Sequence, residues 1–271
     1  MTQQLQPHQL QQLKTLRQMS LSWAPIMDNF PSKAGNIESS QGDCVLFNGL
    51  LAYSGYMQAA QYIPLSISDD GRPTRSPRLA NKEPDIDGFS KDMLIGILLY
   101  SIKTNDPKPL QKVMKYVNKT GCLCPKSTDR RCKITPTIAH LTNQVAKKLG
   151  IKERLFTYIN GPIFSLLEYT TAAFNPLGYQ LHLVAVKTLI RQALGEDCSR
   201  TVAKLNERDA NPFFVYLSGD KVKSYELLVE RVYGLPNPNK SQWAWEREDK
   251  EAAYKDSMGW DVVFMCNLLL K

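Results

Sequence analysis

Apolar residues recur every three or four positions along most of the chain, which is the spacing of one face of an α-helix. The pattern predicts helices over 8–23, 43–61, 89–102, 106–121 and 135–150. Later stretches predict further helices near 152–159, 162–172, 178–194, 197–206, 220–233 and 256–270. The alternation typical of a half-buried strand is not sustained anywhere. We therefore expect an all-α protein.

The loops between these helices alternate in length. The loops 64–87 and 120–134 are long, whereas 103–106 is short. Stacked antiparallel αα-hairpins produce such alternation, because their long loops gather at one end and form a mouth. We expect a single helical domain over 1–271, in which an amino-terminal helix within 1–30 packs on a hairpin array over 43–271.

Composition narrows the class of protein. The chain has 271 residues, of which 43% are hydrophobic and 22% charged, and a chain of this length can bury a large core without disulfides or metal ions. The longest apolar runs, 94–100 and 262–270, are far shorter than the roughly 18–20 residues that cross a bilayer. The amino terminus is rich in Gln where a signal peptide is apolar. We therefore expect a cytoplasmic or phage-borne protein without a membrane partner.

The charge of +8 is unevenly distributed. Residues 103–152 contain twelve Lys or Arg and only two acids, Asp106 and Asp129, so this segment carries a charge of +10. A basic surface of this density attracts polyanions, although the same lysines are also typical of solvated helix faces. Nucleic acid is an unfavourable partner, because Tyr116 is the only aromatic residue in the segment and no nucleic-acid-binding motif is present.

The densest polar cluster, residues 85–92, leads directly into the apolar helix predicted over 89–102. Asp87 or Ser90 can cap this helix, and Asp92 falls in its first turn, where the helix dipole favours a carboxylate. Capping does not account for three acids within eight residues. Asp87 and Asp92 are therefore candidate catalytic carboxylates, with Ser90 and Lys91 as candidate substrate contacts.

An arginine-rich loop, 71–78, precedes this cluster. Its guanidinium groups form paired hydrogen bonds with carboxylates and similar anions. We expect Arg75 and Arg78 to bind the negative groups of a substrate beside Asp87 and Asp92.

Three of the four tryptophans lie within residues 243–260. Tryptophan faces stack on sugar rings, so Trp243, Trp245 and Trp260 are candidate stacking platforms. Arg247 and Asp261 are neighbouring candidates for hydrogen bonds to a substrate. The alternative is that these rings close the core where the last hairpin meets the first. We expect at least one of them to join the arginines and aspartates at the long-loop mouth.

Cysteine and histidine offer few further sites. Cys122, Cys124 and Cys132 could form a loop disulfide, remain free thiols or ligate a metal, for which His140 is the one nearby fourth ligand. The spacing matches no familiar zinc module, and we expect no metal and no cofactor. His182 lies among apolar residues and is either a buried core histidine or a substrate contact at the rim.

Six segments of the chain, the cluster 87–93 and five others, together resemble one protein family. These other segments are 43–55, 75–78, 181–183, 211–214 and 257–261. Together they resemble an (α/α)-toroid family, which is similar to six-hairpin glycosidases and polysaccharide lyases. The resemblance implies hairpins arranged as an (α/α)-toroid or an incomplete toroid.

Two hypotheses for the function follow. The first is a hydrolase or lyase acting on an acidic polysaccharide, with Asp87 and Asp92 as the acid and base in a cleft at the long-loop end. The second is a non-catalytic helical component of a phage or secretion system that binds a polyanion or packs in an assembly. The sequence leaves the oligomeric state open.

Overall fold

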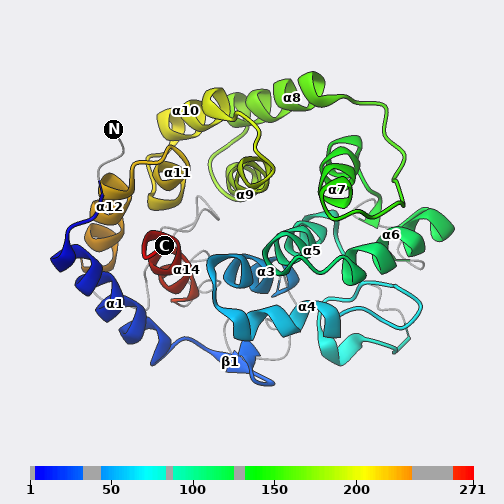
Figure 1. Cartoon of the computed structure of the whole chain (residues 1–271), viewed down its shortest axis with the longest axis horizontal. Helices are drawn as coiled ribbons and strands as arrows, with labels where there is room; N and C mark the ends of the chain where they lie inside the picture. The colour runs from blue at the N-terminus through cyan, green and yellow to red at the C-terminus, as the bar shows by residue number, and fades with distance from the viewer. Residues whose placement is uncertain (1–3, 33–43, 84–87, 125–131, 234–258) are drawn as a thin grey trace. The chain divides into compact units, whose positions relative to one another are not determined.

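A computed structural model describes residues 4–32, 44–83, 88–124, 132–233 and 259–271 (Figure 1). Most of these residues are helical, so the expected all-α class is confirmed. The α-helices of the described ranges are α1 (Pro7–Leu21), α3 (Cys44–Ser54), α4 (Tyr62–Leu65), α5 (Lys91–Thr104), α6 (Lys108–Thr120), α7 (Pro136–Lys148), α8 (Gly161–Phe174), α9 (Tyr179–Ala193), α10 (Ser199–Arg208), α11 (Pro212–Leu217), α12 (Lys221–Tyr233) and α14 (Trp260–Leu269). Two-residue strands β1 (Ile26–Met27) and β2 (Phe30–Pro31) pair antiparallel.

None of these helices is both long and apolar enough to cross a bilayer. By its internal contacts the chain divides into two compact units. Unit 1 comprises 1–39, 165–192 and 196–271, and unit 2 comprises 40–164 and 193–195. The expectation of one domain over the whole chain stays a prediction, as does the toroid.

Unit 2 is organised around α5, the helix that contains the apolar run 94–100. Every residue from Met93 to Ser101 is buried, as expected of a helix that is apolar on all sides. Its main partner is α3, and the two helices meet at a pair of glycines. A Cβ added at Gly96 would lie 2.2 Å from the Val45 carbonyl oxygen, so the backbones approach closely because neither Gly49 nor Gly96 has a side chain.

Unit 1 is organised around α14, the helix that contains most of the second apolar run, 262–270. Helices α1, α11 and α12 pack against it, and Figure 1 shows α1 (blue) beside α14 (red). The turn before α14 is equally close-packed, because a Cβ added at Gly259 would lie 2.3 Å from the Trp23 ring. Arg17 of α1 donates to the side chain of Asn267 over 2.6 Å.

The structure differs from the sequence prediction at three elements. The helix expected over 43–61 ends at Ser54, because Gly55 takes a left-handed conformation (φ 112°). The prediction of a helix over 152–159 is wrong. The side chain of Asn143 instead donates to the Leu155 carbonyl and accepts from the Leu155 amide, which takes both backbone groups of Leu155 away from helical hydrogen bonds. Helix α11, which the apolar pattern did not predict, begins with the Asn211 side chain accepting from the Phe214 amide.

Candidate functional site

The candidate site lies in unit 2 where the chain enters α5. Ser90 is the N-cap, and its hydroxyl accepts a hydrogen bond from the Met93 amide over 3.4 Å. Asp92 and Lys91 follow in the first turn and are both partly exposed. The free amides of this turn favour negative charge, so they stabilise the Asp92 carboxylate and any anion bound beside it.

The arginine-rich loop before α5 is held by its own polar side chains. Thr74 donates from its amide and its hydroxyl to the Ser66 carbonyl, each over 2.8 Å. The Ser68 amide donates to the Arg72 carbonyl over 2.9 Å. Buried loops are uncommon because their backbone groups need partners, and these hydrogen bonds provide them. These hydrogen bonds therefore hold the backbone that carries the arginines in one conformation.

Each of two arginines in this loop donates one hydrogen bond to a backbone carbonyl between the loop and α5. The Arg75 Nε group donates to the Gly88 carbonyl over 2.9 Å, and Arg72 donates to the Lys82 carbonyl. Each bond uses one of the five N–H donors of its guanidinium and fixes the orientation of the group. Arg78 lies one turn further on, in a short 3₁₀ helix (Pro77–Leu79), and is partly exposed.

A shallow pocket forms between the loop and the entry to α5. The residues that line it are Arg72, Pro73, Thr74, Arg75, Leu79, Glu83, Gly88, Phe89 and Cys124. Sequence reasoning identified Arg75 but missed Glu83, because nothing in the local pattern brings position 83 back to the arginines. The pocket offers guanidinium groups, one carboxylate and a buried aromatic ring around a cavity of about 20 Å³, which has room for one small polar or charged group.

The pocket adjoins the most basic helix of unit 2. Lys112, Lys115 and Lys119 are exposed along one face of α6. The loop packs on this helix, since a Cβ added at Gly71 would lie 2.5 Å from the Lys112 carbonyl oxygen. Burial and the nearby Asp70 carboxylate raise the pKa of Tyr116 on the same helix, whereas Arg72 acts in the opposite direction.

Other predicted site residues lie in the core of unit 1. Trp260 is 1% exposed and donates from its ring nitrogen to the Pro25 carbonyl over 2.9 Å. Asp261 is fully buried beside it. His182 on α9 is also buried, with its ring 6.4 Å from that of Phe213. The burial of Trp260 and His182 is that of the packing role which the sequence offered as their alternative, and Trp260 has no exposed face on which a sugar could stack.

Four predicted site residues lie outside the described residues, namely Asp87, Trp243, Trp245 and Arg247. Of the others in unit 2, Arg75 donates to the Gly88 carbonyl just before α5, Ser90, Lys91 and Asp92 lie at the start of α5, and Arg78 lies in the 3₁₀ helix of the loop. Their convergence with a tryptophan stays a prediction.

Sequence reasoning missed a group of buried charges in unit 1. The Lys187 ammonium lies 2.6 Å from the Glu168 carboxylate, and the Arg191 guanidinium lies 2.7 Å from that of Glu196. Arg191 also donates to the hydroxyl of Ser165 over 2.7 Å. A signal was present, because Glu168 is the one charged residue within 155–180. The Lys187–Glu168 pair and the bond of Arg191 to Ser165 join α8 to α9, which is a structural role.

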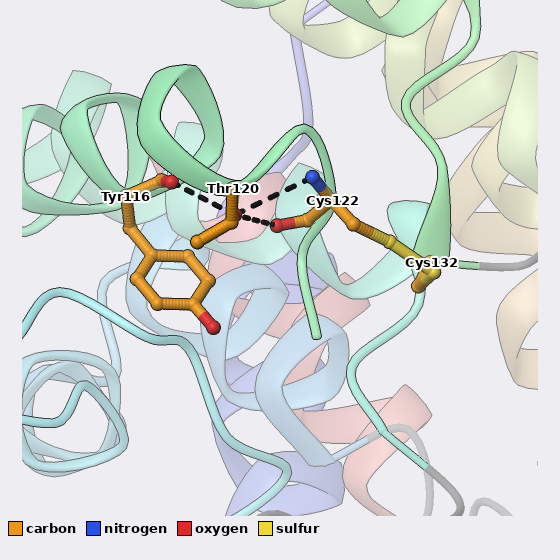
Figure 2. Close-up of a disulfide and its surroundings, with 4 residues drawn as sticks. All are labelled: Tyr116, Thr120, Cys122 and Cys132. Atoms are coloured by element: carbon orange, nitrogen blue, oxygen red, sulfur yellow. Dashed lines mark hydrogen bonds between the residues drawn. A yellow bond between two sulfur atoms is a disulfide. The ribbon is translucent and has the colours of Figure 1, made fainter. Parts of the chain in front are cut away.

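The loop after α6 brings the three clustered cysteines together, with a disulfide between Cys122 and Cys132 (Figure 2). Of the alternatives considered for these residues, the loop disulfide is the one observed for this pair. Cys124 is buried and not part of a disulfide, as are Cys44, Cys198 and Cys266. Burial raises the pKa of Cys266 to about 12, so this thiol is unreactive in the folded protein.

Comparison with protein families, with curated proteins and with solved structures finds no match to this chain. The resemblance to (α/α)-toroid enzymes therefore rests on the sequence segments alone, and the function must be argued from the site.

Proposed function

We propose that the chain is a carbohydrate-active enzyme that binds an acidic polysaccharide at the arginine-lined pocket of unit 2. The observation that carries this proposal is the pocket itself, in which Arg72 and Arg75 are oriented by bonds to the loop beside the start of α5. Guanidinium groups bind carboxylate or sulfate substituents through paired hydrogen bonds. The exposed lysines of α6 extend the positive surface for a longer chain.

The candidate chemistry is hydrolysis or elimination. In hydrolysis, one carboxylic acid protonates the leaving oxygen, while a second carboxylate attacks the sugar or activates water. Asp92 is the carboxylate for the second role, because the first turn of α5 stabilises its negative charge. Asp87 is the predicted acid, and Glu83 is a further carboxylate at the pocket. In elimination, the arginines would instead neutralise the uronate carboxylate and make its neighbouring proton easier to remove.

The test is a screen of acidic polysaccharides for new reducing ends and for unsaturated products. We expect turnover of at least one uronate-containing or sulfated polymer, and loss of at least 100-fold in turnover for Asp92→Asn with an unchanged melting temperature. Asp220→Asn is the matched control, because Asp220 also lies at a helix start but in unit 1, where it accepts from the Lys223 amide. Full activity in Asp92→Asn would contradict the assigned role.

A second candidate function, a non-catalytic component of an assembly, is favoured by α8 and the turn that follows it. Within residues 165–179, five large apolar side chains are exposed, although most such residues are buried in globular proteins. They are Leu166 (61%), Leu167 (41%), Phe174 (80%), Leu177 (43%) and Tyr179 (54%). The hydroxyls of Thr170 and Thr171 donate to carbonyls of the same helix, each over 2.8 Å. Covering this face would therefore cost few hydrogen bonds to water.

The occupant that best fits this face is a second copy of the chain. The chain carries +8, so copies meeting through lysine-rich surfaces repel each other, whereas residues 169–180 carry no charge. Sedimentation velocity should show a dimer that Phe174→Lys converts to monomer, while Ala203→Lys on exposed α10 leaves it intact. A wild-type monomer at all concentrations would exclude this assembly.

A further inference from the structure

The three cysteines after α6 lie closer together than a disulfide requires. Their sulfur atoms all lie within 4.8 Å of one another, although only Cys122 and Cys132 are bonded. Cys124 is 5% exposed and Cys132 is 3% exposed, so the cluster is largely shielded from water. A disulfide needs two sulfurs, and the position of the third is what calls for a further explanation.

The spacing of the sulfurs suits a metal ion. Zinc binds thiolates at about 2.3 Å, which places neighbouring sulfurs roughly 4 Å apart in a tetrahedral or trigonal site. The three sulfurs lie within 4.8 Å of one another, so reduction of the disulfide, which lets its two sulfurs move apart, followed by side-chain rotations would bring all three to this spacing. Thiolate ligands select thiophilic ions such as Zn²⁺ and Cu⁺.

The backbone holds the three positions independently of the disulfide. The Leu123 amide donates to the Cys132 carbonyl over 3.0 Å, which ties the two ends of the loop together. The Thr120 hydroxyl donates to the Cys122 carbonyl over 2.8 Å (Figure 2). Leu123 itself is fully buried and anchors the segment between Cys122 and Cys124. The cluster should therefore persist when the sulfur–sulfur bond is broken.

The charge of the segment suits bound thiolates. Three thiolates around Zn²⁺ carry a net charge of −1, and around Cu⁺ a net charge of −2. Residues 119–133 contain five Lys or Arg and one acid, and positive charges favour the thiolate form of cysteine.

We propose that the reduced form of this loop binds one thiophilic metal ion through the thiolates of Cys122, Cys124 and Cys132. Reduction of the disulfide by a dithiol takes up two electrons and two protons, and the dithiol becomes a disulfide. Metal binding then displaces the proton of each of the three thiols. The fourth position of a zinc ion would be taken by water, as in sites that keep an open position. The loop would thus exchange a disulfide for a metal according to the redox state.

The test measures bound metal in the full-length chain. The protein is reduced without oxygen, incubated with Zn²⁺ or, separately, with Cu⁺, freed of unbound ion and analysed for metal per chain. We expect one ion per reduced chain and none per oxidised chain. Cys124→Ser should lose the ion, whereas Cys198→Ser, which changes a buried thiol outside the cluster, should keep it. A comparison of the metal bound after incubation with Zn²⁺ and after incubation with Cu⁺ identifies which ion the site prefers.

A spectroscopic measurement covers the case in which Cys124→Ser does not fold. Co²⁺ added to the reduced wild-type chain should give sulfur-to-cobalt charge-transfer absorption, which a carboxylate or imidazole site lacks. Reduced protein that takes up no Zn²⁺, Cu⁺ or Co²⁺ would overturn the proposal and leave a structural disulfide. A Cys124→Ser variant that is folded and still binds one ion would overturn it as well.

Discussion

The contact between α3 and α5 depends on the absence of a side chain at Gly96, which makes Gly96→Ala a sharp test of the packing in unit 2. The new Cβ would lie 2.2 Å from the Val45 carbonyl oxygen and 2.6 Å from the Leu46 Cα. Both atoms belong to the backbone, so neither can move aside by changing a rotamer. The two helices must separate by about 1 Å or more to restore ordinary contact distances of about 3.5 Å.

Two opposing effects set the size of the change. Alanine gains about 0.5–1 kcal/mol over glycine in a helix interior. Overpacking of a close-packed core costs about 1–3 kcal/mol, and more when the backbone must shift. We therefore expect Gly96→Ala to lower the free energy of unfolding by about 1–3 kcal/mol, which corresponds to a melting temperature lower by roughly 3–10 °C for a protein of this size.

Urea unfolding and thermal melting measure this effect. The matched control is Gly161→Ala, since a Cβ at Gly161 meets no atom within 4 Å. This control should change the free energy of unfolding by less than about 0.5 kcal/mol. If Gly96→Ala were as stable as the wild type, the close approach of α3 and α5 would be wrong.

Three further predictions concern single interactions. Ser90→Ala removes the cap of α5 and should cost about 1 kcal/mol in urea unfolding; no loss would mean that the cap contributes nothing to stability. Burial, followed by the hydrogen bond to Asp106, raises the pKa of Tyr100 to about 12, so between pH 10 and 12 the folded chain keeps a proton that the unfolded chain loses. The free energy of unfolding should therefore fall as pH rises through this range, and less steeply in Tyr100→Phe; equal slopes would refute this assignment. Glu168→Gln leaves the Lys187 ammonium largely buried without its carboxylate and should cost about 3 kcal/mol by the urea midpoint, most of which Glu168→Gln/Lys187→Met should restore if the lost ion pair is the cause.

Local signals in the sequence predicted much of the fold. The apolar runs at 94–100 and 262–270 became the central helices of the two units, because a helix without a polar face has to be buried. Gly121 and Gly150 end α6 and α7 in left-handed conformations, with φ of 76° and 70°. These features depend only on residues within a turn or two of each other.

The failed predictions have tertiary causes. Residues 152–159 have a helical pattern, yet the amide side chain of Asn143 binds both backbone groups of Leu155 outside any helix. Trp260 has an aromatic ring of the kind that stacks on sugars. In the structure, however, the ring is buried among neighbouring helices and donates to the Pro25 carbonyl. Neither partner is visible in the local sequence.

The candidate site was predictable only in part for the same reason. Arg75, Ser90 and Asp92 stood out because they flank the start of a strongly apolar helix. The position of Glu83 at the pocket depends on how the loop folds back. The sulfur of Cys124 beside the disulfide depends on the pairing of Leu123 with Cys132. Neither arrangement follows from residue spacing.

The most direct test of the central claim is equilibrium binding of acidic and neutral polysaccharides to the wild type and to Arg75→Gln. The account predicts binding of at least one acidic polymer that weakens as salt is raised, no binding of a neutral polymer such as dextran, and at least tenfold weaker binding by Arg75→Gln. Arg200→Gln, which changes an exposed arginine of α10 in unit 1, should bind as the wild type does. Absence of binding to every acidic polymer, or equal binding by Arg75→Gln and the wild type, would contradict an acidic-polysaccharide site at this pocket.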